Sequence, residues 1–205
     1  MPFSTTAEFR TSIKNWSKRT DLSDAEIDDF TLLFEAEFFA EARIRAMENV
    51  DTAFSVSSEL TALPTGFKEL RSIKNTTAPN YGLQLTTPQD LADRFQDGST
   101  GYPVFYCIEG DNLRVGPAPD GTYTFRLDYY KALTTITGGT VNWLLTNHPG
   151  VYLFGTLRHV PDYTGDHELA KWDQRYQAAK AVMLAEDARS KRGGSQPAMR
   201  VRNVV

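Results

Sequence analysis

Three histidines and two nearby acids are the residues whose types could support chemistry: His148, His159, His167, Asp162 and Asp166. Imidazoles and carboxylates bind Zn²⁺ and move protons. Their spacing matches no metal signature, because His159 and His167 are eight positions apart across a proline and no His-Glu-x-x-His motif occurs. A segment rich in Asp, Gly and Pro is typical of a turn. We therefore expect helix caps and surface positions here, and no metal site.

No other pattern in the chain indicates catalysis or cofactor binding. There is no Gly-x-Ser-x-Gly motif, no Walker phosphate loop and no dinucleotide fingerprint, and Gly138-Gly139 precedes Thr-Val rather than a helix with a phosphate-binding lysine. The single cysteine, Cys107, excludes an intrachain disulfide and a multi-thiolate zinc site. It lies in an apolar run and is expected to be buried. We predict a non-enzymatic protein without cofactors.

An acidic run from Asp21 to Glu41 holds eight acids and no base. Paired carboxylates could in principle act as an acid and a base. The interpretation we favour is a solvated helix face, on which the first acids complement the helix dipole. Tyr102, Tyr106 and the pair Tyr129-Tyr130 could stack on nucleobases, but few basic residues interleave with them, so core or interface packing is expected.

The charge of the chain is unevenly distributed. The net charge is −4, yet residues 189–205 contain five bases and no acid, so this segment carries +5 and the remainder −9. An acidic body disfavours a broad nucleic-acid-binding surface, since phosphate binding requires basic residues. The N-terminus has no secretion-signal pattern and no run approaches the roughly 20 apolar residues of a membrane span, which predicts synthesis in the cytoplasm.

Two amphipathic segments at the start of the chain predict helices that need packing partners. Phe9, Ile13 and Trp16 form one stripe within residues 5–17. Ser23 and Glu26 form a capping-box pattern, which begins a long helix from about residue 24 to 49. The apolar positions of that helix are Ile27, Phe30, Leu33, Phe34, Ala36, Phe38, Ala40, Ile44 and Met47. Because they cover more than one stripe, we expect burial over more than a narrow seam.

From Asp51 to about Ala132 the periodicity indicates strands. The short apolar runs are 53–57, 67–73, 104–108, 112–115 and 122–129. We expect the last three to form an antiparallel meander, in which the final strand alternates between buried apolar and exposed polar residues. A short helix interrupts the sheet at 87–95, where Thr87 is an N-cap and Pro88 follows.

Helical patterns return in the last third of the chain. Short helices are expected at 142–146 and from about 148 to 160, followed by a long helix. The stripe of the long helix is Leu169, Trp172, Tyr176, Ala179 and Met183, and Ala178, Ala181, Val182 and Ala185 beside it allow another helix to approach closely. From Arg189 the pattern gives way to a flexible basic arm.

The expected fold is therefore of the α+β class. A helical bundle formed by residues 1–49 and 142–188 carries an inserted small antiparallel β-sheet region, 50–141. These segments form a single domain, 1–188, and residues 189–205 form the extended C-terminal arm.

Four stretches, in this order and spacing, resemble the head-to-tail adaptor proteins of phage virions, akin to tail tubular protein A of short-tailed phages. They are Leu63-Pro-Thr-Gly-Phe-Lys-Glu-Leu-Arg-Ser-Ile73, the segment from Tyr102-Pro-Val-Phe to Gly-Thr-Tyr123, Asn142-Trp-Leu-Leu-Thr-Asn-His-Pro-Gly-Val-Tyr-Leu-Phe-Gly-Thr-Leu157, and Trp172-Asp-Gln-Arg-Tyr-Gln-Ala-Ala-Lys-Ala181.

The resemblance implies a structural virion protein at the head-tail interface, with no catalytic residues. It implies twelve copies in a ring that joins the portal protein to a downstream nozzle or tail-tube protein, while DNA passes through the channel without specific binding and no membrane is involved. Acids at the lumen would reduce phosphate attraction, and Glu35, Glu37 and Glu41 are one candidate set.

The C-terminal arm is the segment that the resemblance assigns to portal docking. Its matching residues here are Arg189, Lys191, Arg192, Arg200, Val201, Arg202, Val204 and Val205. Alternating bases and valines suit a segment that orders on binding, as an added strand for example. Two rival functions remain: a head-completion or tail-tube protein of another connector class, and a tail-associated lytic enzyme.

Overall fold

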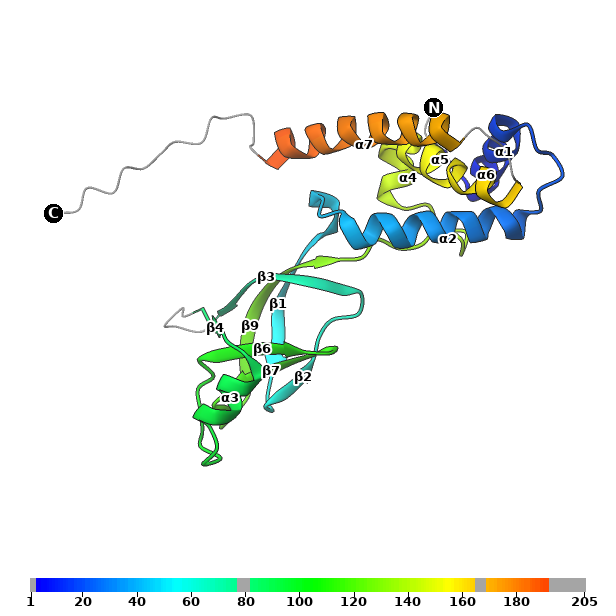
Figure 1. Ribbon diagram of the computed structural model, residues 1–205. Helices are drawn as coiled ribbons and strands as arrows, with labels where there is room; N and C mark the ends of the chain where they lie inside the picture. The colour runs from blue at the N-terminus through cyan, green and yellow to red at the C-terminus, as the bar shows by residue number, and fades with distance from the viewer. Residues whose placement is uncertain (1–2, 77–81, 165–168, 192–205) are drawn as a thin grey trace. The chain divides into compact units, whose positions relative to one another are not determined.

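The chain contains one helical and one β-rich compact unit. The computed structural model describes residues 3–76, 82–164 and 169–191, apart from the side chains of Asp162 and Thr164 (Figure 1). The helical unit comprises Met1–Ala46 and Leu133–Val205, and the β-rich unit comprises Met47–Ala132. Helices and strands together place the protein in the α+β class, which confirms the predicted class.

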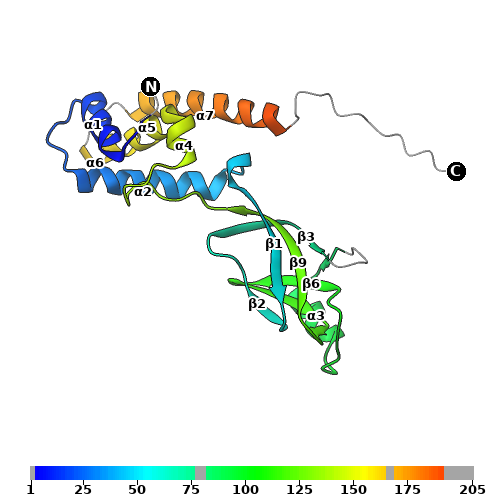
Figure 2. The same ribbon diagram turned by 180° about the vertical axis from the view of Figure 1, so that it is seen from behind.

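The helical unit is organised around one short central helix. Its helices are α1 (Thr6–Ser17), α2 (Asp24–Glu41), α4 (Trp143–Asn147), α5 (Pro149–Leu157), α6 (His159–Thr164) and α7 (Leu169–Lys191). Helix α5 packs against all five of the others and lies between α2 and α7 in both views (Figures 1 and 2). Six of its nine residues are buried, so α5 forms the core of this unit.

Close packing at α5 depends on a glycine. A Cβ atom built on Gly155 would lie 2.3 Å from the ring of Phe34 in α2, which is closer than atoms in contact can approach. Phe34 is fully buried, and its ring also meets those of Tyr152 in α5 and Tyr176 in α7. The absence of a side chain at position 155 therefore lets α2 approach α5 directly.

Helix α2 ends earlier than the sequence predicted. It stops at Glu41, because Ala42 adopts an extended backbone and Arg43 Nη1 donates hydrogen bonds to the carbonyl oxygens of Ala40 and Ala42 at 3.0 and 2.9 Å. A 3-10 turn, η1 (Arg45–Met47), follows. The apolar spacing that favoured a helix to residue 49 comes from Met47 and its neighbours, which are buried outside any α-helix.

The end of the helical unit also differs from the sequence expectation. Pro161 does not prevent helix formation, because it lies within the first turn of α6, where a missing N–H removes no intrahelical hydrogen bond. Helix α7 continues through Lys191, so Arg189 belongs to this helix and not to the expected arm. The N-caps Ser23 and Asn142 begin α2 and α4.

The β-rich unit contains three small sheets and one helix. Its elements are β1 (Glu48–Val56), β2 (Leu60–Ala62), β3 (Phe67–Asn75), β4 (Gln84–Leu85), α3 (Pro88–Arg94), β5 (Thr100–Gly101), β6 (Phe105–Glu109), β7 (Asn112–Gly116), β8 (Ala118–Pro119) and β9 (Tyr123–Lys131). The sheet orders are β1-β9-β3, β2-β7-β6-β4 and β5-β8.

The predicted three-stranded meander is wrong in its last strand. Strands β6 and β7 form the expected hairpin, with Gly110 at φ +59° in its turn. Strand β9, however, pairs with β1 and β3, because β2 occupies the free edge of β7 and the nine residues of β9 match the length of β1 and β3. The predicted alternation within β9 is confirmed, since Phe125 and Leu127 are buried while Arg126 is exposed.

The core of the β-rich unit is almost purely apolar. It consists of Phe54, Val56, Ile73, Leu83, Leu113, Val115, Phe125, Leu127 and Tyr129. Cys107 is also buried, as predicted. The interior of this unit is therefore held together mainly by apolar packing.

Candidate functional site

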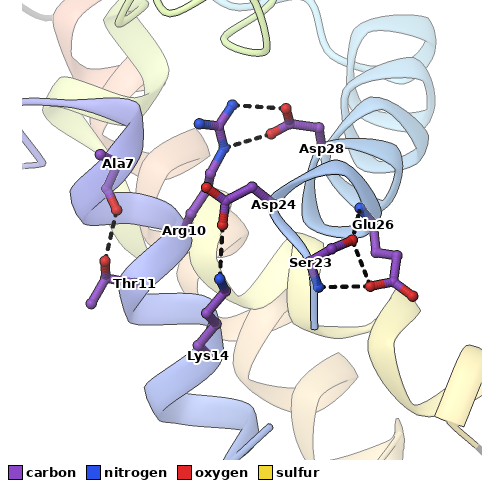
Figure 3. A network of polar contacts seen from close by, with 8 residues as sticks. All are labelled: Ala7, Arg10, Thr11, Lys14, Ser23, Asp24, Glu26 and Asp28. Atoms are coloured by element: carbon purple, nitrogen blue, oxygen red, sulfur yellow. Dashed lines mark hydrogen bonds and ion pairs between the residues drawn. The ribbon is translucent and has the colours of Figure 1, made fainter. Parts of the chain in front are cut away.

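The acidic run of α2 begins with a polar network that joins α2 to α1 (Figure 3). Arg10 donates two hydrogen bonds to the carboxylate of Asp28, at 2.9 and 2.7 Å, and Lys14 donates one to Asp24 at 2.8 Å. Ser23 and Glu26 form the predicted capping box through bonds of 3.2 and 2.7 Å. Lys14 lowers the pKa of Asp24, so this carboxylate stays ionised. These acids act in helix docking as well as in capping.

The acids at the end of α2 contact bases from the C-terminal helices. Arg158 donates to Glu37 at 2.6 Å, and its guanidinium lies 4.1 Å from the centre of the Tyr176 ring. Lys180 in α7 donates to Glu41 at 2.6 Å. Desolvation by burial raises the pKa of Tyr176 to about 12. The acids of α2 therefore face several elements of the helical unit rather than solvent alone.

Glu35 contradicts the expectation of a solvated acidic face. Its exposed fraction is 2%, and it lies inside the helical unit. Glu35 Oε1 accepts hydrogen bonds from the Tyr152 hydroxyl at 2.5 Å and from the Ile136 backbone N–H at 2.9 Å. It therefore does not present a carboxylate to any channel, which removes it from the candidate lumen acids.

A buried polar network extends from Glu35 to the segment that precedes α4. Asn142 Nδ2 donates to the Tyr152 hydroxyl and to the Thr134 carbonyl oxygen, both at 2.7 Å. Desolvation by burial is the main cause that raises the pKa of Glu35, and burial together with the neighbouring Glu35 raises the pKa of Tyr152. The network fixes residues 134–142 against α2 and α5.

The spacing of Glu35 from the apolar residues of α2 indicates that it is buried, although its acidic neighbours suggest exposure. Thr31, Glu35 and Phe38 follow Ile27 at i+4, i+8 and i+11, which is the buried stripe of the helix. Two polar residues on this stripe indicate buried groups with partners rather than solvent contacts. Sequence reasoning grouped Glu35 with its acidic neighbours and missed it.

The histidines occupy separate places. His148 Nδ1 lies 3.9 Å from Glu186 in α7, and its ring is 5.1 Å from that of Trp143. His159 Nε2 lies 3.9 Å from Glu37 in α2. His167 is outside the described residues. Within the described residues, no group of three or more His, Cys, Asp or Glu side chains could hold a metal ion.

The tyrosines considered for base stacking pack within the β-rich unit. Tyr129 is 3% exposed and stacks on Phe67, with ring centres 5.6 Å apart, and Tyr106 packs against the apolar core. Tyr102 meets Tyr123 edge to face. The expectation of packing roles is confirmed for these three tyrosines.

The root of the predicted docking arm is a helix end held by specific bonds. Lys191 Nζ lies 2.8 Å from Asp187 Oδ2 and donates to the Arg43 carbonyl oxygen at 3.1 Å. Asp187 also accepts from the Arg45 N–H at 2.7 Å. Arg189 is exposed on α7. The other proposed docking residues, Arg192, Arg200, Val201, Arg202, Val204 and Val205, lie outside the described residues.

Within the described residues, the site is thus a set of helix-docking contacts, and the comparison with known families agrees with a structural role. The family of the SU10 adaptor protein matches residues 4–202, and the chain belongs to this family. It is an adaptor structural protein of a phage, which implies a virion component with a non-enzymatic role in contact with portal and tail proteins. No curated protein matches the sequence. Among the described residues, no helix is long and apolar enough to cross a membrane.

Proposed function

We propose that this adaptor protein forms a ring of twelve copies, which joins the portal to the next tail component and lines the channel for DNA. The family match over residues 4–202 is the observation that carries this proposal. The two-unit organisation supports it, because a helical bundle and a separate β-rich unit could contact different neighbours. The helical bundle with its sheet insertion and C-terminal arm is part of this proposal.

The charge distribution supports a channel that does not hold DNA. Residues 1–188 carry a net charge of −9, so a ring of these units would not attract phosphates strongly. Glu37 and Glu41 remain candidates for the lumen, although each is already paired with a base, Arg158 and Lys180 respectively. A weak field at the wall would let DNA slide through the ring.

The C-terminal arm is proposed to dock on the portal. The bonds of Lys191 to Asp187 and Arg43 hold the end of α7, so the arm starts from a fixed point. Beyond it, Arg192, Arg200 and Arg202 supply positive charge, and Val201 and Val204 supply apolar side chains for a complementary groove or sheet edge. The proposed arm thus begins at a helix end that is held by specific bonds.

Truncation after Lys191 tests the docking role. This variant keeps every described contact of α7, so we expect an unchanged melting temperature and a loss of co-sedimentation with portal rings. A matched variant, Arg192→Gln with Arg200→Gln and Arg202→Gln, keeps the arm's length and separates charge from apolar contacts. Normal co-sedimentation of the truncated protein would contradict arm docking.

Assembly on the portal is a second consequence of the proposal. We expect the isolated protein to be monomeric or weakly associated and to form rings only when the portal is present. Analytical ultracentrifugation with and without portal measures this difference. A stable dodecamer of the isolated protein at micromolar concentration would contradict it.

A further inference from the structure

The outer face of α2 is apolar and exposed, although its sequence predicted burial. Leu32 and Leu33 have exposed fractions of 42% and 54%, and Ala25, Ala36 and Ala40 are exposed as well. These five residues are spaced i, i+7, i+8, i+11 and i+15, which places them on one stripe of the helix. We call this stripe the α2 face.

Helix α2 is thus apolar on two sides, and only one of them is covered within the chain. Its inner stripe, with Ile27, Phe34 and Phe38, is buried in the helical unit. Leucines that gather on one exposed stripe mark an interaction surface more often than leucines that are scattered singly.

The outer face of α7 is a second exposed apolar stripe. Val182 is 60% exposed, and Ala178, Ala181 and Ala185 are exposed beside it at spacings i, i+3, i+4 and i+7. The inner stripe of the same helix, with Trp172, Tyr176 and Met183, is buried against the core. We call the outer stripe the α7 face. Its small side chains permit another helix to approach closely.

The two faces lie on opposite sides of the helical unit. Helix α5 packs against both α2 and α7 and lies between them in both views (Figures 1 and 2). Each face is exposed, so each is directed away from α5. One copy can therefore present its α7 face to a second copy's α2 face, while its own α2 face stays open for a third copy.

The charges of the two helices are complementary. Helix α2 has no base, and Asp29 lies within its outer stripe; Glu35 is buried, and the acids paired with bases of the same chain are Asp24, Asp28, Glu37 and Glu41. Helix α7 carries five bases and three acids, with Arg175 and Arg189 near the two ends of its outer stripe. Opposite charges at the rim favour α2 against α7, whereas two α2 helices would repel each other. This argues against a two-fold α2–α2 contact.

We propose that the α7 face of one copy packs against the α2 face of the next copy, so that the chain associates head to tail. The occupant of each apolar face is thus another copy of this protein. The inference rests on the proposed ring and names the surface that would close it. A head-to-tail contact generates a ring when its rotation closes.

Single charge substitutions test each face. Leu33→Glu disrupts the α2 face and Val182→Glu disrupts the α7 face, because each places a carboxylate in an apolar contact. Leu184→Glu on another side of α7 and Leu60→Glu in β2 are matched controls, since these leucines are also exposed, at 41% and 51%. Particles assembled with portal are counted by electron microscopy, and each face variant should reduce complete rings at least about tenfold, with the controls unchanged.

Mixing the two face variants distinguishes head-to-tail association from other arrangements. A Leu33→Glu copy keeps its α7 face and a Val182→Glu copy keeps its α2 face, so the mixture has one competent contact. We expect native mass spectrometry at high protein concentration to detect a dimer with one copy of each variant, and no larger species. Neither variant alone should form this dimer.

Site-specific cross-linking provides a second readout that needs no loss of assembly. Ala36→Cys and Ala181→Cys copies should cross-link with each other through a short bis-maleimide, and each alone should not. The natural Cys107 is 2% exposed and does not compete. Rings that form normally from both face variants would overturn this interface while the ring proposal stands. A wild-type protein that forms no ring on the portal would overturn both.

Discussion

The two units of the chain are stabilised in different ways. The helical unit encloses a carboxylate, Glu35, together with Tyr152 and Asn142 in one hydrogen-bonded network. The core of the β-rich unit includes Tyr129 and is otherwise built from aliphatic and phenyl side chains. The stability of the helical unit therefore depends on specific polar partners and on ionisation, whereas that of the β-rich unit depends mainly on packing volume.

The positions of the tryptophans allow the unfolding of the two units to be distinguished. All three tryptophans of the chain, Trp16, Trp143 and Trp172, belong to the helical unit, and the β-rich unit has none. Tryptophan fluorescence therefore reports unfolding of the helical unit, while circular dichroism reports both units. A change that is confined to the helical unit should therefore shift the fluorescence transition more than the circular dichroism transition.

Removing the buried carboxylate should have the largest effect. Glu35→Ala leaves the Tyr152 hydroxyl and the Ile136 N–H without their acceptor, which costs about 3 kcal/mol of unfolding free energy. The matched variant Cys107→Ala in the β-rich unit removes a buried side chain whose thiol makes one long hydrogen bond to Glu109, at 3.7 Å, and should cost about 1 kcal/mol. Urea unfolding followed by tryptophan fluorescence measures the cost of Glu35→Ala. Equal losses of unfolding free energy in the two variants would contradict the difference between the two units.

Substitution of the close-packed glycine in the helical unit should also cost more unfolding free energy than substitution of the one in the β-rich unit. Gly155→Ala places a methyl group 2.3 Å from the fully buried ring of Phe34 and should destabilise the helical unit by about 2 kcal/mol. Gly116→Ala meets the ring of Phe95 at 2.7 Å and Cγ of the buried Leu91 at 3.1 Å. Because Phe95 is only half-buried and can move, a cost of about 1 kcal/mol is expected, below that at Gly155. Thermal unfolding of both variants checks the order, and a larger cost at Gly116 would contradict it.

The stability of the helical unit should respond to the protonation of Glu35. Burial raises the pKa of Glu35, so the folded state holds this proton more tightly than the unfolded chain. Stability contributed by the neutral form is fully present below the unfolded pKa, about 4.3, and is lost as the pH rises through the higher folded pKa.

The variant Glu35→Gln isolates this dependence, because all other titrating groups are unchanged. The stability of Glu35→Gln relative to wild type should increase from pH 4.5 to pH 8 in fluorescence-detected urea unfolding. Circular dichroism reports both units, so the part of its transition that does not coincide with the tryptophan signal, and that therefore reports the β-rich unit, should show no such trend. Parallel pH curves for the two proteins would show that Glu35 titrates as an ordinary carboxylate.

The polar contacts between α1 and α2 should have the smallest effect. Arg10 and Asp28 are partly exposed, so their bidentate pair is screened by solvent. A double-mutant cycle with Arg10→Ala and Asp28→Ala should give a coupling energy of about 0.5 kcal/mol, which falls as salt is added. A coupling above about 2 kcal/mol would place this pair on a level with the Glu35 network.

Local features of the fold could be predicted from the sequence, and features that depend on distant segments could not. The capping box of Ser23 and Glu26 and the alternation around Phe125 are written in neighbouring residues, and the structure confirms both. The pairing of β9 with β1 and β3 depends on which strand edges are free, and the segment after α2 is held by α7, in which Asp187 and Lys191 bond to the backbone of Arg45 and Arg43.

The buried Glu35 and the two proposed docking faces also depend on segments that are distant in the sequence. The burial of Glu35 is decided by Tyr152 and Ile136, which are more than a hundred residues away in the sequence. Conversely, Leu33 and Val182 stand on apolar stripes that the sequence makes plain, but their exposure becomes known only when the helices are packed. Apolar periodicity predicts that a face is covered, and it does not predict which molecule covers it.

A density map of the virion at medium resolution would test the proposed ring most directly. We expect a ring of this chain between the portal and the tail, with residues 192–205 of each copy reaching the portal and α7 of one copy against α2 of the next. Density for the chain in the tail tube, or away from the portal, would contradict it.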